Sequence, residues 1–219
     1  MPEVDVLGAP QSNFVRTVRM ALEEKGVPYT LVPVRPHTPE IDAVHPLGKI
    51  PCLRHGDFSL CESQAIAAYI DRAFPGPALF PGEVQEAAVI EQWVSICNTA
   101  VIPCIQPYMA AYYFPGTADG QPDKAAVAAA FPKVEAQLKL LDRTVTATGY
   151  LAGARFSYAD MNILPVLAYL AGLPESGGAM KALPALTRYF ETHSKRPSFV
   201  NTVPPPFSEL PPRVEHGKG

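Results

Sequence analysis

The 219-residue sequence predicts a small α/β domain followed by an all-helical domain. In the first third, apolar residues alternate between short strand-like runs and helical spacing, whereas later they recur only at the three-four spacing of helices. The two patterns meet at residues 75–83, a segment with three prolines and two glycines that is typical of a linker. We therefore expect domains at residues 1–77 and 86–202, a linker at 78–85, and a Pro-rich tail at 203–219.

The first domain is predicted to contain a mixed four-stranded sheet with helices. Its strands are expected at residues 4–7, 29–34, 50–53 and 58–61. A helix from Ser12 to Gly26 connects the first two strands, which predicts that they are parallel, and the turn at residues 55–57 predicts an antiparallel hairpin. A second helix opens at Ser63 and ends before Pro75.

The second domain is predicted to be a helical bundle. Apolar residues follow helical spacing over residues 90–112, where Pro103 and Pro107 should kink the helix, and again over 127–145. A third helix begins with a capping signature, in which Ser157 is the N-cap and Asp160 returns the hydrogen bond. That helix is apolar nearly all round, so we expect it in the middle of the bundle.

The last predicted helix spans residues 184–193. The tail beyond it contains Pro204-Pro205-Pro206 and Pro211-Pro212. We expect this tail to be an extended or disordered strap, because successive prolines favour an extended backbone.

Composition excludes several classes of function. The 18 Lys and Arg nearly balance the 21 Asp and Glu, and no basic cluster indicates a nucleic-acid or anionic membrane partner. We find no uninterrupted apolar run of about 20 residues and no signal-peptide core, so we expect a cytoplasmic protein. Four cysteines without CxxC spacing and five scattered histidines predict reduced thiols and no metal site.

Ser12 is the first candidate for chemistry. It lies at the start of the first helix, directly after the first strand, where a serine most often serves only as an N-cap. Its hydroxyl becomes functional only if a ligand binds there.

The segment 45–52, His-Pro-Leu-Gly-Lys-Ile-Pro-Cys, is the second candidate. Pro51 is our candidate for a cis peptide bond, since about 5% of X-Pro bonds in folded proteins are cis. A cis bond there would leave the N–H and C=O of Ile50 free to pair with an extended peptide. An ordinary trans proline at a strand start is the alternative.

Glu62 and Ser63 are the third candidate. Ser63 is expected to be the N-cap of its helix, whereas Glu62 precedes the cap and has no capping role. An anion at this helix start would meet the free first-turn N–H groups, and Glu62 could hold an ammonium nearby. Together they predict a receptor for an α-amino acid zwitterion.

These features, in this order and spacing, resemble the cytosolic glutathione transferases. The matching pieces are Ser12 with Arg16 and Val18, and residues 22–29, 46–51, 62–66, 69–70, 150–153, 156–160 and 196–199. The resemblance covers nearly the whole chain except the tail. Its serine-type pattern, Ser-x-x-x-Arg-x-Val, is most similar to the plant-type phi class.

The resemblance implies a thioredoxin-like first domain that binds glutathione as cosubstrate, usually in a homodimer. Glu62 and Ser63 would hold the γ-glutamyl end, the Ile50 backbone beside Pro51 would pair with the cysteinyl unit, and Lys49 would reach the glycyl carboxylate. Ser12 matches the catalytic serine, which would stabilise the glutathione thiolate with a hydrogen bond.

The expected activity is conjugation of glutathione to hydrophobic electrophiles. An aromatic cluster near the end of the long kinked helix is a candidate lining for the electrophile, although such clusters are more often core or interface. The candidate substrate-binding residues are Phe14, Tyr108, Met109, Tyr112 and Tyr113. Peroxide reduction, isomerisation or dehalogenation on the same fold, and a non-catalytic binding or scaffold protein, remain alternatives.

Overall fold

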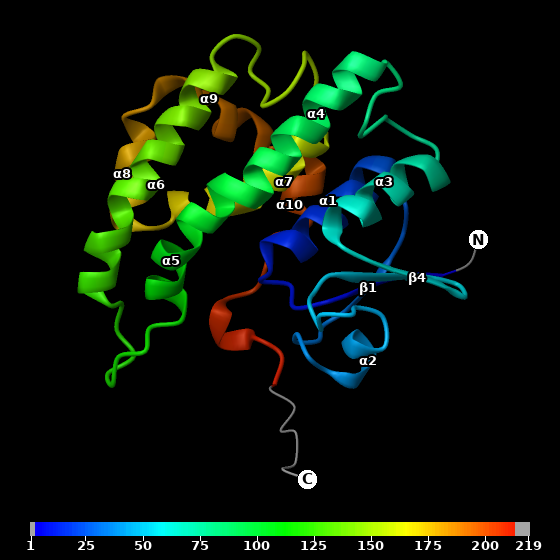
Figure 1. Ribbon diagram of the computed structural model, residues 1–219, viewed down its shortest axis with the longest axis horizontal. Helices are drawn as coiled ribbons and strands as arrows, with labels where there is room; N and C mark the ends of the chain where they lie inside the picture. Colours follow the sequence, from blue (N-terminus) through cyan, green and yellow to red (C-terminus); the bar gives the residue numbers. More distant parts are fainter. Residues whose placement is uncertain (1–2, 213–219) are drawn as a thin grey trace. The chain divides into compact units, whose positions relative to one another are not determined.

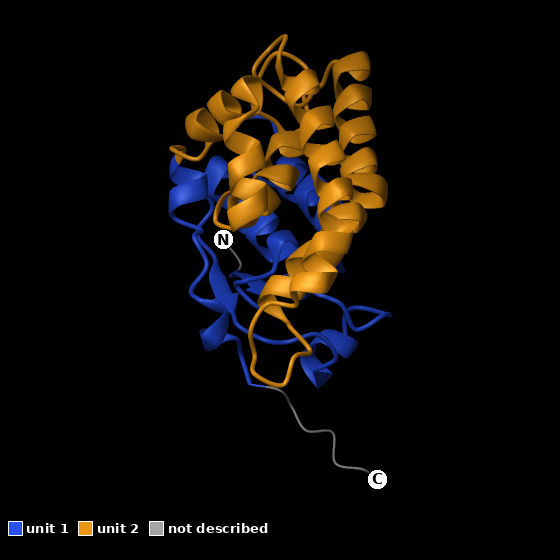
Figure 2. Ribbon diagram, turned by 90° about the vertical axis from the view of Figure 1, so that its left-hand side faces the viewer, with its two compact units in different colours: residues 1–79, 197–219 blue, residues 80–196 orange. Residues whose placement is uncertain are grey.

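The computed structural model describes residues 3–212, so the tail prediction for residues 213–219 lies outside the described part. The chain forms two compact units (Figure 2). Unit 1 contains the chain up to Leu79 and again from Pro197 onward, and unit 2 contains Phe80–Arg196. Residues 197–202, which the predicted boundaries assign to the helical domain, therefore group with unit 1.

Unit 1 is built on a mixed four-stranded sheet of order β2-β1-β3-β4 (Figure 1). The strands are β1 (Val4–Leu7), β2 (Thr30–Val32), β3 (Cys52–His55) and β4 (Phe58–Cys61). As predicted, β1 is parallel to β2 and β4 is antiparallel to β3, and β3 is also antiparallel to β1. The prediction for the third strand was wrong by two residues: β3 begins at Cys52 because Pro51 has no N–H to donate to the ladder.

Two helices carry most of the packing in unit 1. Helix α1 (Asn13–Lys25) and helix α3 (Ser63–Ala73) pack against each other, and apolar residues from both are completely buried with the inner face of the sheet. Helix α1 ends at Gly26, whose φ of 65° suits glycine, as the sequence predicts. The short α2 (Pro39–Asp42) was not predicted, because one turn of helix has no detectable apolar period.

Residues 197–212 also belong to unit 1. Within α10 (Pro197–Val200), the centre of the Phe199 ring lies 4.0 Å from the Arg16 guanidinium, which also donates to the Phe199 carbonyl. Further on, the Gln11 amide donates to the Pro206 carbonyl at 3.0 Å, and Arg35 donates to the Pro211 carbonyl. The described part of the tail is thus an ordered strap that includes a short 3₁₀ turn, Phe207–Glu209.

Unit 2 is all helical, as predicted. It contains α4 (Val84–Ile96), a π-helical turn (Cys97–Val101), α5 (Ile102–Tyr113), α6 (Lys124–Val145), α7 (Tyr158–Ala171), α8 (Pro174–Lys181) and α9 (Pro184–His193). Figure 1 shows α5 beside α6, and these two helices share an extensive contact. Helix α9 has the predicted bounds, whereas α8 was missed because its Ser-Gly-Gly sequence has little helical propensity.

The predicted kink of the long helix takes the form of a π-helical turn. The Ile102 N–H donates to the carbonyl of Cys97, five residues back, immediately before Pro103. A proline cannot donate to the carbonyl four residues before it and its ring clashes with that group, so a wider turn accommodates it. The helical hydrogen bonding continues through this turn, so residues 84–113 form one uninterrupted helical segment.

The length and hydropathy of the long helix also bear on the expectation that the chain has no membrane-spanning segment. The sequence shows no long uninterrupted apolar run, yet Val84–Tyr113 forms one 30-residue helix that is long and apolar enough to span a membrane, with a mean hydropathy of 1.4 in its most apolar window. Core helices of soluble proteins meet the same criterion, and this helix packs against α6 and α7. Only one third of that window is buried in the chain itself.

Helix α7 runs through the interior of unit 2, as predicted, and Asp160 fixes its start. The fully buried Asp160 carboxylate accepts hydrogen bonds from the Ser157 N–H (2.9 Å), the Leu151 N–H (2.8 Å) and the Tyr189 hydroxyl (2.9 Å). Burial raises the pKa of Asp160, and these three donors act in the opposite direction. One side chain therefore joins three segments of unit 2.

We predict that Asp160→Ala lowers the free energy of unfolding by about 2–4 kcal/mol, because three buried donors lose their acceptor together. Urea denaturation followed by circular dichroism measures this change. The control is Glu191→Ala, an exposed position on α9 where we expect a change within about 0.5 kcal/mol. Equal midpoints for the two variants would contradict the role given to Asp160.

Candidate functional site

Three loops of unit 1 leave the sheet at the same edge. Leu7 at the end of β1 pairs with Cys52 at the start of β3, and Cys52 pairs with Cys61 at the end of β4. The three residues form one row across the sheet. Three loops therefore meet the sheet side by side: the loop from β1 to Ser12, the loop of residues 49–51 before β3, and the connection at Glu62 after β4. The structure thus brings the predicted glutathione-site residues to one edge.

Gly8 allows this edge to close tightly. It has a φ of 151°, and a Cβ atom at this position would lie 2.5 Å from the Val15 side chain and 3.1 Å from Cβ of Ile50. Only glycine lets the end of β1 approach both α1 and Ile50. Sequence reasoning missed Gly8, although a glycine between a predicted strand and helix could have been noticed.

Ser12 occupies the N-cap position of α1. Its half-buried hydroxyl accepts a hydrogen bond from the Val15 N–H at 3.4 Å, so the common structural explanation applies. That bond uses a lone pair of the oxygen and leaves the hydroxyl proton for a second partner. The first turn of α1 contains no acidic residue, so the positive end of the helix dipole is not offset there.

The loop before β3 has the backbone geometry that the sequence predicts. The Ile50–Pro51 peptide bond is cis. Ile50 is half-buried against the sheet, whereas the Lys49 side chain is exposed. This loop therefore places the Ile50 backbone next to the cationic side chain of Lys49.

Glu62 has an unusual backbone conformation. Its φ of 70° and ψ of 113° lie outside the common left-handed well, which costs on the order of 1–3 kcal/mol for a residue other than glycine. The prediction for the cap was wrong by one residue: Glu62 is the N-cap and Ser63 is the first helical residue. The Glu62 side chain makes no cap hydrogen bond and is 67% exposed, so its carboxylate is turned outward.

His45 lies behind Glu62 and holds it in place. The Leu47 N–H donates to Nδ1 of His45 at 3.0 Å, which requires a lone pair on Nδ1 and places the proton on Nε2. Nε2 lies 3.3 Å from Oε1 of Glu62, and the imidazole is only 3% exposed. Sequence reasoning gave His45 no role, although it begins the His-Pro-x-Gly motif.

The structure separates the candidate substrate residues. Tyr108 is fully buried, and its hydroxyl donates to Glu175 at 3.0 Å and accepts from the Ser176 N–H at 3.2 Å, so its side chain belongs to the interior of unit 2. Met109 and Tyr113 are half-buried, and the Tyr113 ring packs edge-on against Tyr169. Phe14 lies in unit 1, in the first turn of α1, and is half-buried.

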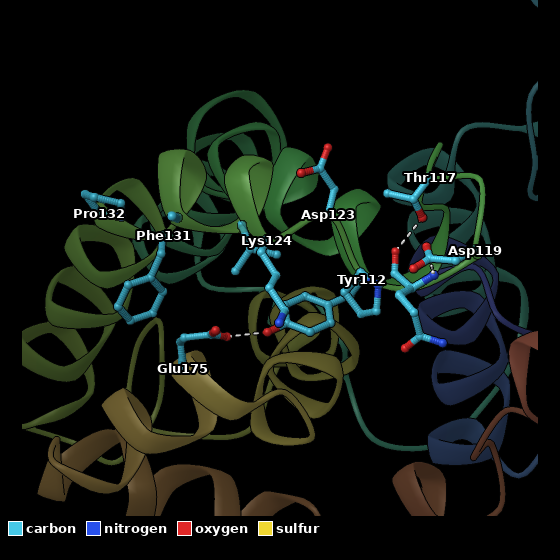
Figure 3. Close-up of a pocket in the computed structure, with 12 residues that line it drawn as sticks. Tyr112, Thr117, Asp119, Asp123, Lys124, Phe131, Pro132 and Glu175 are labelled. Carbon is cyan, nitrogen blue, oxygen red and sulfur yellow. Dashed lines mark hydrogen bonds between the residues drawn. The ribbon is translucent and has the colours of Figure 1, made fainter.

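Tyr112 lines a cavity of about 900 Å³ in unit 2 (Figure 3). The Tyr112 hydroxyl donates to Oε2 of Glu175 at 2.5 Å, and Phe131 closes one side. Burial and the Glu175 carboxylate raise the pKa of Tyr112, whereas the Tyr112 hydrogen bond lowers that of Glu175. None of the glutathione-site candidates from unit 1 lines this cavity. Among residues 3–212, no group of three or more His, Cys, Asp or Glu side chains could hold a metal ion.

A mixed four-stranded sheet with a cis-proline loop, followed by a helical unit, defines the class of two-domain proteins with a thioredoxin-like first domain. Two family models match the chain: the glutathione S-transferase N-terminal domain over residues 6–78 and the C-terminal domain over residues 93–197. Glutathione S-transferase 3 of Zea mays is 31% identical over 221 residues, covering 95% of this chain and 99% of the relative. The chain belongs to the glutathione S-transferase family, and its resemblance to the plant phi class is confirmed.

Solved structures agree with this assignment. Glutathione transferase F7 from Populus trichocarpa has a TM-score of 0.82 and 29% identity, covering 91% of this chain and 97% of that chain. A theta class enzyme from Xanthomonas axonopodis pv. citri, solved with glutathione bound, has a TM-score of 0.80 and 27% identity, covering 93% and 98%. The predicted fold class is confirmed.

We predict that His45→Ala lowers the free energy of unfolding by about 2–3 kcal/mol, because the substitution leaves a cavity and removes the acceptor of the Leu47 N–H. Thermal and urea unfolding measure the change. The matched control is Leu47→Ala in the same turn. That side chain is 60% exposed, so we expect a change below about 0.5 kcal/mol. If His45→Ala is as stable as the control, His45 does not organise this turn.

Proposed function

We propose that this chain conjugates glutathione to hydrophobic electrophiles, with Ser12 stabilising the glutathione thiolate. The observation that carries the proposal is the row Leu7–Cys52–Cys61, which starts all three candidate loops at one edge of the sheet. Membership in the glutathione S-transferase family supports the same activity.

The chemistry depends on ionisation of the glutathione thiol. A thiol of pKa near 8.5 is only a few per cent ionised at neutral pH, and the thiolate is the nucleophile. Lowering this pKa by about two units corresponds to about 2.7 kcal/mol. The Ser12 hydroxyl can donate its proton in a hydrogen bond to the sulfur while it still caps α1. The uncompensated N-terminal end of α1 adds to the effect.

The remaining candidates fit the three parts of glutathione. Glu62 would bind the γ-glutamyl ammonium, since its exposed carboxylate is oriented by His45. Ser63 and the first turn of α3 would bind the γ-glutamyl carboxylate. The Ile50 backbone would pair with the cysteinyl unit as an added strand, and the exposed Lys49 would reach the glycyl carboxylate.

For the electrophile we retain Phe14, Met109, Tyr112 and Tyr113. They are partly exposed and combine apolar rings or a thioether with phenolic hydroxyls, which suits an apolar substrate with a polar group. Tyr108 is left out of this set because its side chain is fully buried and hydrogen-bonded inside unit 2.

We also propose that the protein acts as a homodimer in the cytoplasm. The long helix Val84–Tyr113 is apolar, yet only one third of its most apolar window is buried, and Val84 and Val89 are 79% and 40% exposed. A second copy would cover such a face. All four cysteines are free, which is usual in a reducing compartment.

We predict that the protein sediments as a dimer and that Val89→Lys raises the dimer dissociation constant by about tenfold or more, because a charge would be buried in an apolar contact. Analytical ultracentrifugation over a concentration series measures both. Arg72→Lys, at an exposed position on α3 of unit 1, is a charge-conserving control. A wild-type monomer would contradict the proposed assembly.

For Ser12, we predict that Ser12→Ala returns the pKa of bound glutathione from about 6.5 toward its solution value near 8.5 and lowers kcat by about tenfold or more at neutral pH. Thiolate absorbance against pH measures the pKa, and turnover of an aryl halide measures kcat. Because the variant also loses the helix cap, about 1 kcal/mol of stability should be lost with it.

Two further variants separate these effects. Ser12→Thr keeps both the hydroxyl and the cap, so it should retain a lowered thiol pKa. Ser59→Ala removes an exposed hydroxyl from β4 and should change neither quantity. If wild type leaves the bound thiol at its solution pKa, the role of Ser12 is wrong, and if glutathione does not bind at all, the proposed function is wrong.

A further inference from the structure

Two cysteines face each other beneath the candidate glutathione site. Cys52 on β3 and Cys61 on β4 are directly paired across the antiparallel ladder, and both are free thiols. Directly opposite residues point to the same face of a sheet, and both side chains pack in one cluster with Leu7 and Ile41. Cys52 is fully buried, whereas Cys61 is half-buried.

The type of strand pair brings the two thiols close together. The Gly56 N–H donates to the Glu3 carbonyl, so the backbone groups of alternate residues 52, 54 and 56 are directed toward β1. Cys52 and Cys61 therefore form a non-hydrogen-bonded pair, in which the Cα atoms are about 4.5 Å apart and the side chains are closest. A disulfide needs Cα atoms about 4.4–6.8 Å apart, so this pair meets the requirement without a change of register.

Both cysteines are also one residue from the proposed ligand contacts. Cys52 follows Pro51, and its thiol donates to the carbonyl of Lys49 at 3.7 Å. Cys61 immediately precedes Glu62. A change in the bonding of either sulfur therefore acts directly on the two loops that would hold glutathione.

We propose that Cys52 and Cys61 form a redox-active pair, which a low-molecular-weight disulfide such as oxidised glutathione converts to a cross-strand disulfide that weakens glutathione binding. The weakening of glutathione binding rests on the proposed function, whereas disulfide formation does not.

The reaction proceeds in two exchanges. The half-buried Cys61 loses its proton and its thiolate attacks one sulfur of oxidised glutathione; the S–S bond breaks, a mixed disulfide forms on Cys61, and one glutathione leaves as a thiolate. Cys52 then loses its proton and attacks the Cys61 sulfur, which releases the second glutathione. Two protein thiols are oxidised, one glutathione disulfide is reduced to two thiols, and the two protons pass to the departing thiolates.

The order of attack follows from the surroundings of the two sulfurs. Burial, and to a lesser extent the neighbouring Cys61, raise the pKa of Cys52 to about 11, so it is a poor first nucleophile in bulk exchange. Once Cys61 carries the mixed disulfide, Cys52 attacks within the same molecule, where proximity offsets its weak ionisation. In the product Cys52 has no proton, and the Lys49 carbonyl loses its donor.

The test uses the full chain incubated with oxidised glutathione, followed by alkylation of the remaining thiols and peptide mapping by mass spectrometry. We expect a Cys52–Cys61 link and a protein mass lower by two hydrogen atoms. Cys52→Ala should stop at a glutathionyl adduct on Cys61, and Cys61→Ala should form no link. A wild-type protein that stays unmodified, or that stops at the mixed disulfide, would overturn the proposal.

Calorimetry of glutathione binding to the reduced and the oxidised protein tests the effect of the disulfide on affinity. We expect about tenfold weaker binding after oxidation, corresponding to one lost hydrogen bond, with recovery after dithiothreitol. Cys61→Ala should keep its affinity after the same treatment. Equal affinities of the reduced protein and the disulfide form would overturn the proposed effect on binding. No binding by the reduced protein would instead overturn the proposed function, and the mass measurement would still decide the disulfide.

Discussion

The arrangement of unit 1 depends on the register of three strands. Leu7, Cys52 and Cys61 occupy one row, so the end of β1, the start of β3 and the end of β4 coincide at a single edge of the sheet. A shift of one residue in either pairing would turn every side chain of the shifted strand to the opposite face and would separate the loops. The buried cluster around Leu7, Cys52 and Ile41 opposes such a shift, because it would expose these apolar side chains to water.

Much of the candidate site could be predicted because it follows from local pattern. Ser12 and the cis bond at Pro51 lie where strand ends and proline chemistry indicate them. The role of His45 could not be predicted in the same way, because it depends on two contacts. The Leu47 N–H in the same turn binds Nδ1, whereas Glu62, which lies after β4, contacts Nε2. Gly8 was missed for a related reason: position 8 requires glycine because Ile50, which is far along the chain, approaches it closely.

In unit 2, too, local contacts could be predicted from the sequence and contacts between distant segments could not. Asp160 follows Ser157 by three residues, so the sequence spacing alone predicts their hydrogen bond, although not that Tyr189 would share the carboxylate. The aromatic cluster near the end of α5 looked uniform in sequence. The structure divides it into an interior residue, Tyr108, and a cavity residue, Tyr112, according to the side of the helix that each occupies. Helical periodicity cannot assign these sides when all positions are apolar or aromatic.

The return of residues 197–212 to unit 1 has a consequence for how the protein is made. Arg16 and Gln11 bond to the carbonyls of Phe199 and Pro206, which follow them by 183 and 195 residues in the chain. At about 5–20 residues per second, the ribosome releases α1 many seconds before this segment exists. Unit 2 is continuous in sequence and can complete its helices during synthesis, whereas the buried Arg16 guanidinium of unit 1 meets the Phe199 carbonyl only after all of unit 2 has been made.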